Sequence, residues 1–94
     1  MAPAFDNAAM DGYAVATAAL AGPGPWVLRV VARVPAGRAT TTSVAGAAAA
    51  RIFTGAPIPA GADAVVMQED VQSDGDVIHL SRRPTPGGSV AQMA

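Results

Sequence analysis

The segment WVLRVVARV, residues 26–34, carries the clearest strand signal in this chain of 94 residues. Arg29 and Arg33 fall on one face of an extended backbone, because successive side chains of a strand point to opposite sides. Apolar residues occupy the other face, at Trp26, Leu28, Val30, Ala32 and Val34. Alternation with a period of two predicts a half-buried β-strand.

Two further strands are predicted toward the C-terminus. AVVMQE (64–69) and VIHL (77–80) are rich in β-branched residues. Between them, SDGD (73–76) is typical of a hairpin that turns at Asp74-Gly75, because glycine accepts the positive φ of a tight turn.

The remaining segments are less regular. LAGPGPW (20–26) should end any helix begun upstream, because glycine and proline interrupt helices. Residues 3–15 read as an ordered loop leading into a short extended piece, and ATTTSV (39–44) is β-prone. AGAAAARIF (45–53) leaves two alternatives open, since alanine favours a helix while the following Thr-Gly and prolines favour a strand over 50–53.

The predicted fold class is mainly β: a small irregular barrel-like or bifurcated β-sheet domain with long ordered loops. Residues 1–94 are interpreted as one domain, with 84–94 as a linker tail. The expected core is thin, because 23 of the residues are alanine and alanine contributes little apolar area. Its members are Trp26, Leu28, Val30, Ile52, Phe53, Val65, Val66, Ile78 and Leu80.

Composition excludes several functions. The net charge is −1, and the cationic residues are scattered apart from Arg82-Arg83, which argues against a nucleic-acid partner. Cysteine is absent, so thiolate chemistry and cysteine zinc sites are excluded. No apolar run approaches the roughly 20 residues that span a membrane. A cytoplasmic protein without a membrane partner is the expectation.

Two polar segments are candidates for a functional site. FDNAAMDGYAV (5–15) holds two aspartates that either form turns or line a site. RIFTGAPIPAGADAVVMQED (51–70) places the Thr54 hydroxyl beside Gly55, an arrangement that either shapes a loop or binds a phosphate or another oxyanion.

Together, these two segments resemble the molybdopterin molybdenumtransferases, the MoeA family. The tail PGGSVAQMA (86–94) is similar to a further family segment. The resemblance covers the β-rich second domain and its linker, so the chain looks like a piece of a longer protein. Ala8 stands where the family often has serine.

The resemblance implies a function in forming molybdenum cofactor. Such enzymes insert molybdenum from molybdate into adenylylated molybdopterin, assisted by Mg2+, and act as homodimers. This domain would close the cleft of a site whose pterin-binding part lies elsewhere, so the chain alone is expected to be inactive. Two alternatives remain: a non-catalytic dimerisation or scaffold module of the same family, and an unrelated anion-binding β-domain.

The resemblance also assigns candidate site residues. Asp11 and Thr54 match catalytic positions, and Asp11 is also the candidate metal ligand. Gly12, Gly55 and Arg51 are candidates for substrate binding, although a structural role for Arg51 is an equal alternative.

Other polar residues are interpreted as structural. Asp6 and Asn7 would brace the first loop through backbone hydrogen bonds. Glu69 and Asp70 read as a solvated strand edge rather than ligands, and His79 reads as a surface imidazole.

Overall fold

The computed structural model describes residues 7–8, 10–82, 84 and 90–91. These residues form strands and two short 3-10 helices, η2 (Thr17–Ala19) and η3 (Gln68–Asp70), and contain no α-helix. The strands are β1 (Asn7–Ala8), β2 (Gly12–Val15), β3 (Trp26–Val34), β4 (Ala48–Ile52), β5 (Ala64–Met67), β6 (Val71–Asp74), β7 (Val77–Leu80) and β8 (Val90–Ala91). The prediction of a mainly β fold is confirmed.

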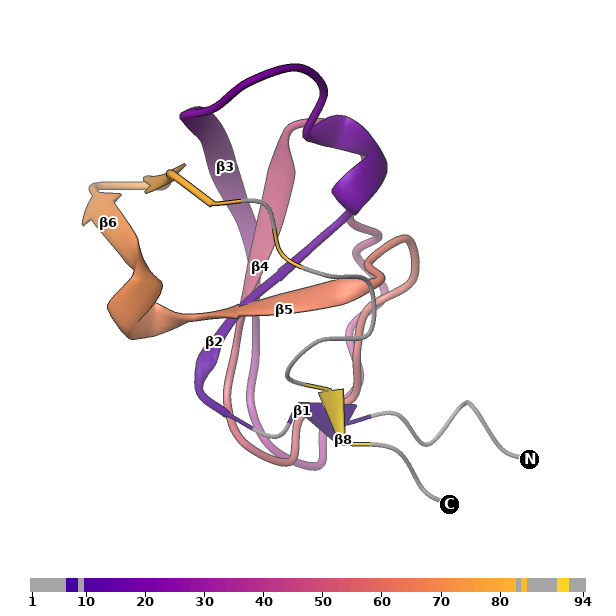
Figure 1. Ribbon diagram of the computed structural model, residues 1–94. Coiled ribbons are helices and arrows are strands. Elements are labelled where there is room, and N and C mark those ends of the chain that lie inside the picture. The colour runs from indigo at the N-terminus through magenta and orange to yellow at the C-terminus, as the bar shows by residue number, and fades with distance from the viewer. Residues whose placement is uncertain (1–6, 9, 83, 85–89, 92–94) are drawn as a thin grey trace.

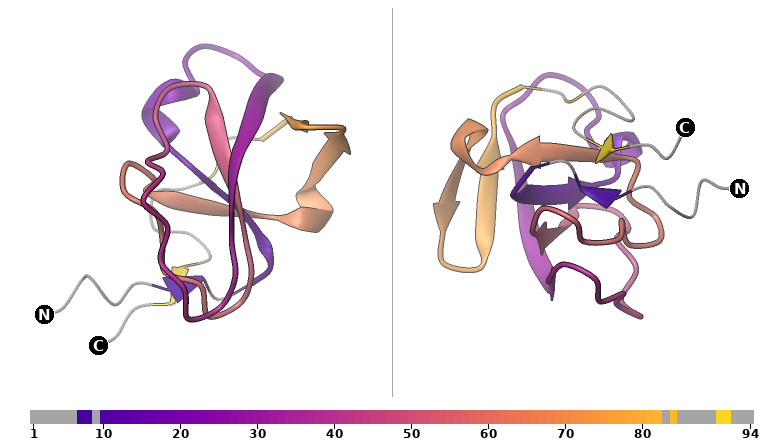
Figure 2. Two further views of the ribbon diagram at one scale, coloured as in Figure 1. Left: turned by 180° about the vertical axis from the view of Figure 1, so that it is seen from behind. Right: turned by 90° about the horizontal axis from the view of Figure 1, so that it is seen from below.

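Six strands form one sheet in the order β5-β2-β4-β3-β7-β6, and β1 pairs with β8 in a separate two-stranded ladder. β3 and β4 run parallel, while the other neighbours in the sheet are antiparallel. Figure 1 shows β5 running across β3 and β4, so the sheet curls into a half-barrel. Figure 2 shows the parallel β3 and β4 side by side from behind.

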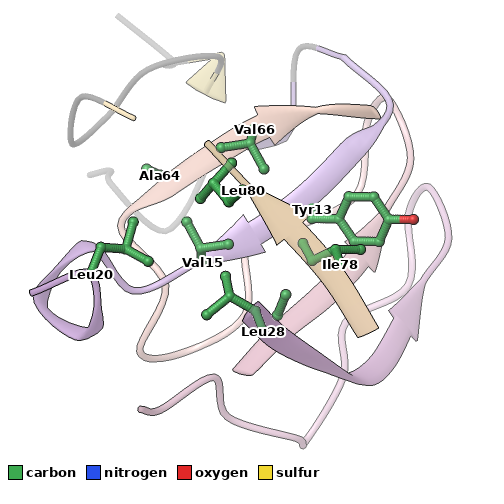
Figure 3. Close-up of a cluster of buried hydrophobic side chains, with 9 residues drawn as sticks. Tyr13, Val15, Leu20, Leu28, Ala64, Val66, Ile78 and Leu80 are labelled. Atoms are coloured by element: carbon green, nitrogen blue, oxygen red, sulfur yellow. The ribbon is translucent and has the colours of Figure 1, made fainter. Parts of the chain in front are cut away.

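Two apolar clusters cover opposite faces of the curled sheet. The first cluster comprises Tyr13, Val15, Leu20, Leu28, Ala49, Ala64, Val66, Ile78 and Leu80 (Figure 3). The second comprises Ala8, Ala14, Val34, Val44, Ala50, Ile52, Ala56 and Val65. All four residues of β2 are buried, because a strand between two apolar layers has no solvent face.

A bulge in β3 divides its apolar residues between the two clusters. Val30 pairs with Ala49, but Ala32 pairs with Ala50, so Val31 is an extra residue in the ladder. An extra residue reverses the side on which every following side chain lies. Placing all five apolar residues of 26–34 on one face was therefore wrong, and so was placing both arginines on the other face.

The alanine-rich segment 45–53 contains a strand, β4, and no helix. β4 lies between β2 and β3 and is hydrogen-bonded to both. Ala49 and Ala50 are fully buried, one in each cluster. Pairing on both sides outweighs the helix propensity of alanine, which is worth less than about 1 kcal/mol per residue.

The other strand predictions hold with small shifts. The second predicted strand ends at Met67 rather than at residue 69 and continues as η3. The hairpin forms between β6 and β7, with Gly75 at φ +66°. Residues 39–44 form no strand despite their β-prone composition. Val44 is buried and donates its N–H to the Ala60 carbonyl at 2.8 Å.

The predicted core is correct for most of its members. Phe53 is the clear exception, since it is partly exposed and belongs to neither cluster. Trp26 and Val30 only pack against the first cluster. The interpretation of 84–94 as a linker tail stays a prediction, because most of this segment lies outside the described residues. Within the segment, Val90–Ala91 pairs with Asn7–Ala8. Within the described part of the chain, no helix is long and apolar enough to cross a bilayer.

Candidate functional site

Asp11 and Thr54 meet at one end of the sheet. Gly12 of β2 pairs with Ile52 of β4 in an antiparallel register, so the residue before β2 comes to lie beside the loop after β4. The Thr54 backbone N–H donates to Asp11 Oδ1 at 2.8 Å, and the Thr54 hydroxyl donates to the same oxygen at 3.0 Å. The structure therefore brings together the two candidates that lie 43 positions apart in sequence.

Both hydrogen bonds end on one carboxylate oxygen of Asp11. Among the described residues, none donates to the other oxygen, Oδ2. The pKa of Asp11 is lowered from the ordinary 3.8, chiefly by the Thr54 N–H and then by its hydroxyl; burial opposes the shift and Arg51 adds to it. Asp11 is thus ionised at neutral pH, and any stability from this contact is lost only as the pH falls through the lowered pKa.

A second Asp–Thr pair lies at the other end of β2. Asp63 accepts the Thr17 backbone N–H on Oδ1 at 2.8 Å and the Thr17 hydroxyl on Oδ2 at 2.7 Å. Both oxygens of Asp63 are therefore used, and the pKa of its carboxyl is lowered mainly by the Thr17 N–H. This carboxylate fixes the turn after β2 to the loop before β5.

No local sequence pattern indicates the Asp63–Thr17 pair. The two residues are 46 positions apart, and Asp63 reads as part of a proline-glycine turn. The two Asp–Thr pairs differ in how the carboxylate is used: Thr17 donates to both oxygens of Asp63, whereas Thr54 donates to only one oxygen of Asp11.

The TGAP turn after β4 is fixed by its backbone. Ala8 donates its N–H to the Ala56 carbonyl and accepts the Gly55 N–H, both at 2.9 Å. Gly55 has φ +88°, a conformation that side chains strongly disfavour. The Ala8 side chain is buried in the second cluster, so a serine hydroxyl there would need a buried partner.

Gly12 is set against the neighbouring strand. A Cβ at Gly12 would overlap the carbonyl oxygen of Val66 and lie 3.0 Å from its carbonyl carbon. Gly12 therefore allows β5 to lie close to β2. Its substrate-binding role stays a prediction.

Arg51 lies next to this site and is held by several contacts. Its Nη2 donates to Gln68 Oε1 at 2.7 Å, and its guanidinium carbon lies 5.2 Å from the Tyr13 ring centroid and 4.8 Å from that of Phe53. Gln68 in turn donates its N–H to the Asp11 carbonyl at 3.2 Å. These contacts fix the position of the charge, which both the structural and the substrate-binding interpretations require.

The remaining candidates are not brought to this place. Glu69 and Asp70 are exposed in η3, as expected for a solvated edge. His79 is half-buried on β7, opposite Val27 and Gln72. Asp6 and the side chain of Asn7 lie outside the described residues, so their bracing role stays a prediction.

The described residues offer little for a resident metal ion. They contain no group of three or more His, Asp or Glu side chains that could hold one. Asp11 Oδ2 is a single free carboxylate oxygen. That donor fits Mg2+ as one ligand of several, because Mg2+ is usually bound by one or two carboxylates with water and substrate phosphates.

Comparison with known proteins identifies relatives over almost the whole chain. The family described as MoeA N-terminal region (domain I and II) matches residues 1–93. Molybdopterin molybdenumtransferase 2 of Mycobacterium tuberculosis (strain H37Rv) is 42% identical over 88 residues, which is 90% of this chain and 22% of the relative. Molybdopterin molybdenumtransferase of Nostoc sp. (strain PCC 7120) is 42% identical over 95 residues, 98% of this chain and 22% of the relative.

A solved structure shares the fold. The molybdopterin biosynthesis moeA protein from Pyrococcus horikoshii OT3 superimposes with a TM-score of 0.85 at 36% identity, covering 98% of this chain and 26% of that protein. The chain thus spans about a quarter or less of the length of the proteins it matches.

Proposed function

The chain belongs to the MoeA N-terminal region family, and from this membership we propose that it serves as the cleft-closing part of a molybdopterin molybdenumtransferase. Two relatives carry that enzyme's name. The proposed reaction is the insertion of molybdenum from molybdate into adenylylated molybdopterin, which yields molybdenum cofactor. Because the chain spans 22% of these relatives, the pterin-binding groups are proposed to come from other parts of the enzyme or from the partner of a homodimer.

The observation that carries the proposal is the free oxygen of Asp11. Thr54 holds Oδ1 with two hydrogen bonds, so the carboxylate has a fixed orientation while Oδ2 faces no donor among the described residues. A positioned, ionised carboxylate on a loop is suited to bind a hard cation or orient a water molecule. Asp63 differs, because each of its two oxygens already accepts a hydrogen bond from Thr17.

The proposed role of Asp11 is to direct charge at the adenylate phosphate. Asp11 would hold Mg2+ through Oδ2, and the cation would neutralise negative charge on the phosphate. Thr54 keeps the carboxylate oriented, and its two hydrogen bonds hold the pKa of Asp11 low. A scaffold module, the alternative function, requires neither a free carboxylate oxygen nor its orientation.

Replacing Thr54 tests whether its hydroxyl orients the Asp11 carboxylate. Thr54→Ala removes the hydroxyl but keeps the backbone N–H that donates to Asp11. We expect turnover of the full-length enzyme to fall roughly three- to tenfold, the scale of one lost hydrogen bond. Thr54→Ser retains the hydroxyl and is the matched control, with near-normal turnover expected. Equal turnover in both variants and the parent would contradict a role for the hydroxyl.

A further inference from the structure

Two arginines lie on the face of the sheet that carries the first cluster. Arg33 of β3 and Arg51 of β4 are direct partners in the parallel ladder, so their side chains leave the sheet on the same side. Both guanidinium groups contact one ring: the guanidinium carbons lie 4.9 Å and 4.8 Å from the Phe53 centroid. The bulge at Val31 is what brings Arg33 to this face.

The described residues supply no carboxylate that pairs with these two charges. The ion pair found in this part of the chain joins Arg29 to Asp76 at 3.9 Å, and the influence of Arg51 on Asp11 is the weakest contribution to the lowered pKa of Asp11. Arg51 Nη1 is buried without a hydrogen-bond partner among the described residues. Two like charges at paired positions of neighbouring strands, without a carboxylate partner among the described residues, favour the binding of an anion.

A concavity of about 380 Å3 lies over the two arginines. Its lining consists of Tyr13, Val30, Arg33, Arg51, Ser73, Gly75 and Asp76. The hairpin between β6 and β7 contributes Ser73, Gly75 and Asp76 to this lining. The Asp76 carboxylate disfavours an anion, but it is largely exposed and directed to Arg29.

We propose that this concavity binds a divalent tetrahedral oxyanion, held by the Arg33 and Arg51 guanidinium groups. Guanidinium groups recognise such oxyanions through paired N–H donors. Arg51 is already fixed by Gln68 at 2.7 Å and by two rings, so little ordering is needed on binding. The oxyanion is either free, as molybdate or phosphate, or part of a phosphate ester. This inference stands on the arginine pair and does not depend on the proposed function.

Titration of the 94-residue chain followed by NMR tests the site. Sodium phosphate, sodium molybdate and AMP are added separately, with sodium chloride at matched ionic strength as the control for screening. We expect saturable shifts of the amides around Tyr13 and Arg51 with an apparent dissociation constant at or below roughly 1 mM. Tighter binding of AMP identifies a phosphate ester as the ligand, whereas equal or weaker binding identifies the free oxyanion.

Arginine variants distinguish binding in the concavity from a general effect of positive charge on the protein surface. Arg33→Gln removes an exposed guanidinium and is expected to weaken binding roughly tenfold or more. Arg38→Gln makes the same charge change in an exposed turn outside the concavity and should bind normally. Asp76→Asn should bind more tightly. Shifts that do not saturate, or equal losses in Arg33→Gln and Arg38→Gln, would overturn the proposal whatever the activity of the full-length enzyme.

Discussion

Asp11→Asn in the full-length enzyme is expected to lower turnover about 100-fold or more, the scale for losing a group that directs charge in a reaction. The melting temperature should barely change. An asparagine oxygen can still accept both hydrogen bonds from Thr54, and only the charge and the second oxygen are lost. The measurements are turnover on adenylylated molybdopterin with molybdate, and thermal unfolding.

Asp63→Asn is the matched control for this variant. It makes the same change in charge, but both of its oxygens accept hydrogen bonds from Thr17, and an amide nitrogen cannot accept. Its melting temperature should therefore fall by a few degrees while turnover of the folded enzyme stays normal. Near-normal turnover in Asp11→Asn would leave Asp11 with only a turn-forming role.

Gly12→Ala is expected to destabilise the domain by about 3 kcal/mol or more, because a methyl group here meets backbone rather than a movable side chain. The Cβ would overlap the Val66 carbonyl oxygen, so β2 and β5 would have to separate along their ladder. For a domain of this size such a loss lowers the melting temperature by about 12 °C or more. Thermal unfolding of the 94-residue chain measures it.

Gly46→Ala is the control that distinguishes the steric clash at Gly12 from the general effect of replacing a glycine by alanine. Gly46 has φ +62° and open space around a Cβ, so an alanine there costs only the strain of the left-handed backbone, roughly 1–2 kcal/mol. Gly12→Ala should be the more damaging change. The opposite order would show that the Val66 carbonyl can move aside.

Local sequence patterns predicted the strands that depend on local chemistry. The alternation over 26–34 and the SDGD turn correspond to β3 and the β6–β7 hairpin. The bulge at Val31 could not be predicted, because it depends on how β3 pairs with β4. The alanine-rich strand could not be resolved either, since its conformation depends on partners on both sides.

The candidate site was predictable only through resemblance. Nothing local links Asp11 to Thr54 or Asp63 to Thr17; both contacts follow from the antiparallel pairing of β2 with β4 and β5. Phe53 was assigned to the core for its apolar ring. The structure instead places its ring against two guanidinium groups, where the face of a ring attracts cations.

The position of β2 in the sheet sets the order of events during synthesis. β2 lies between β4 and β5, so it leaves the ribosome long before either neighbour exists. At about 5–20 residues per second, the chain waits seconds for β5 to be made. The apolar GYAV strand has two unpaired edges until β4 has emerged at Ile52, and one unpaired edge until β5 has emerged at Met67. Unpaired strand edges are the features that chaperones and aggregation both act on. The sheet therefore closes late, because β5, β6 and β7 are the last of its strands to be made.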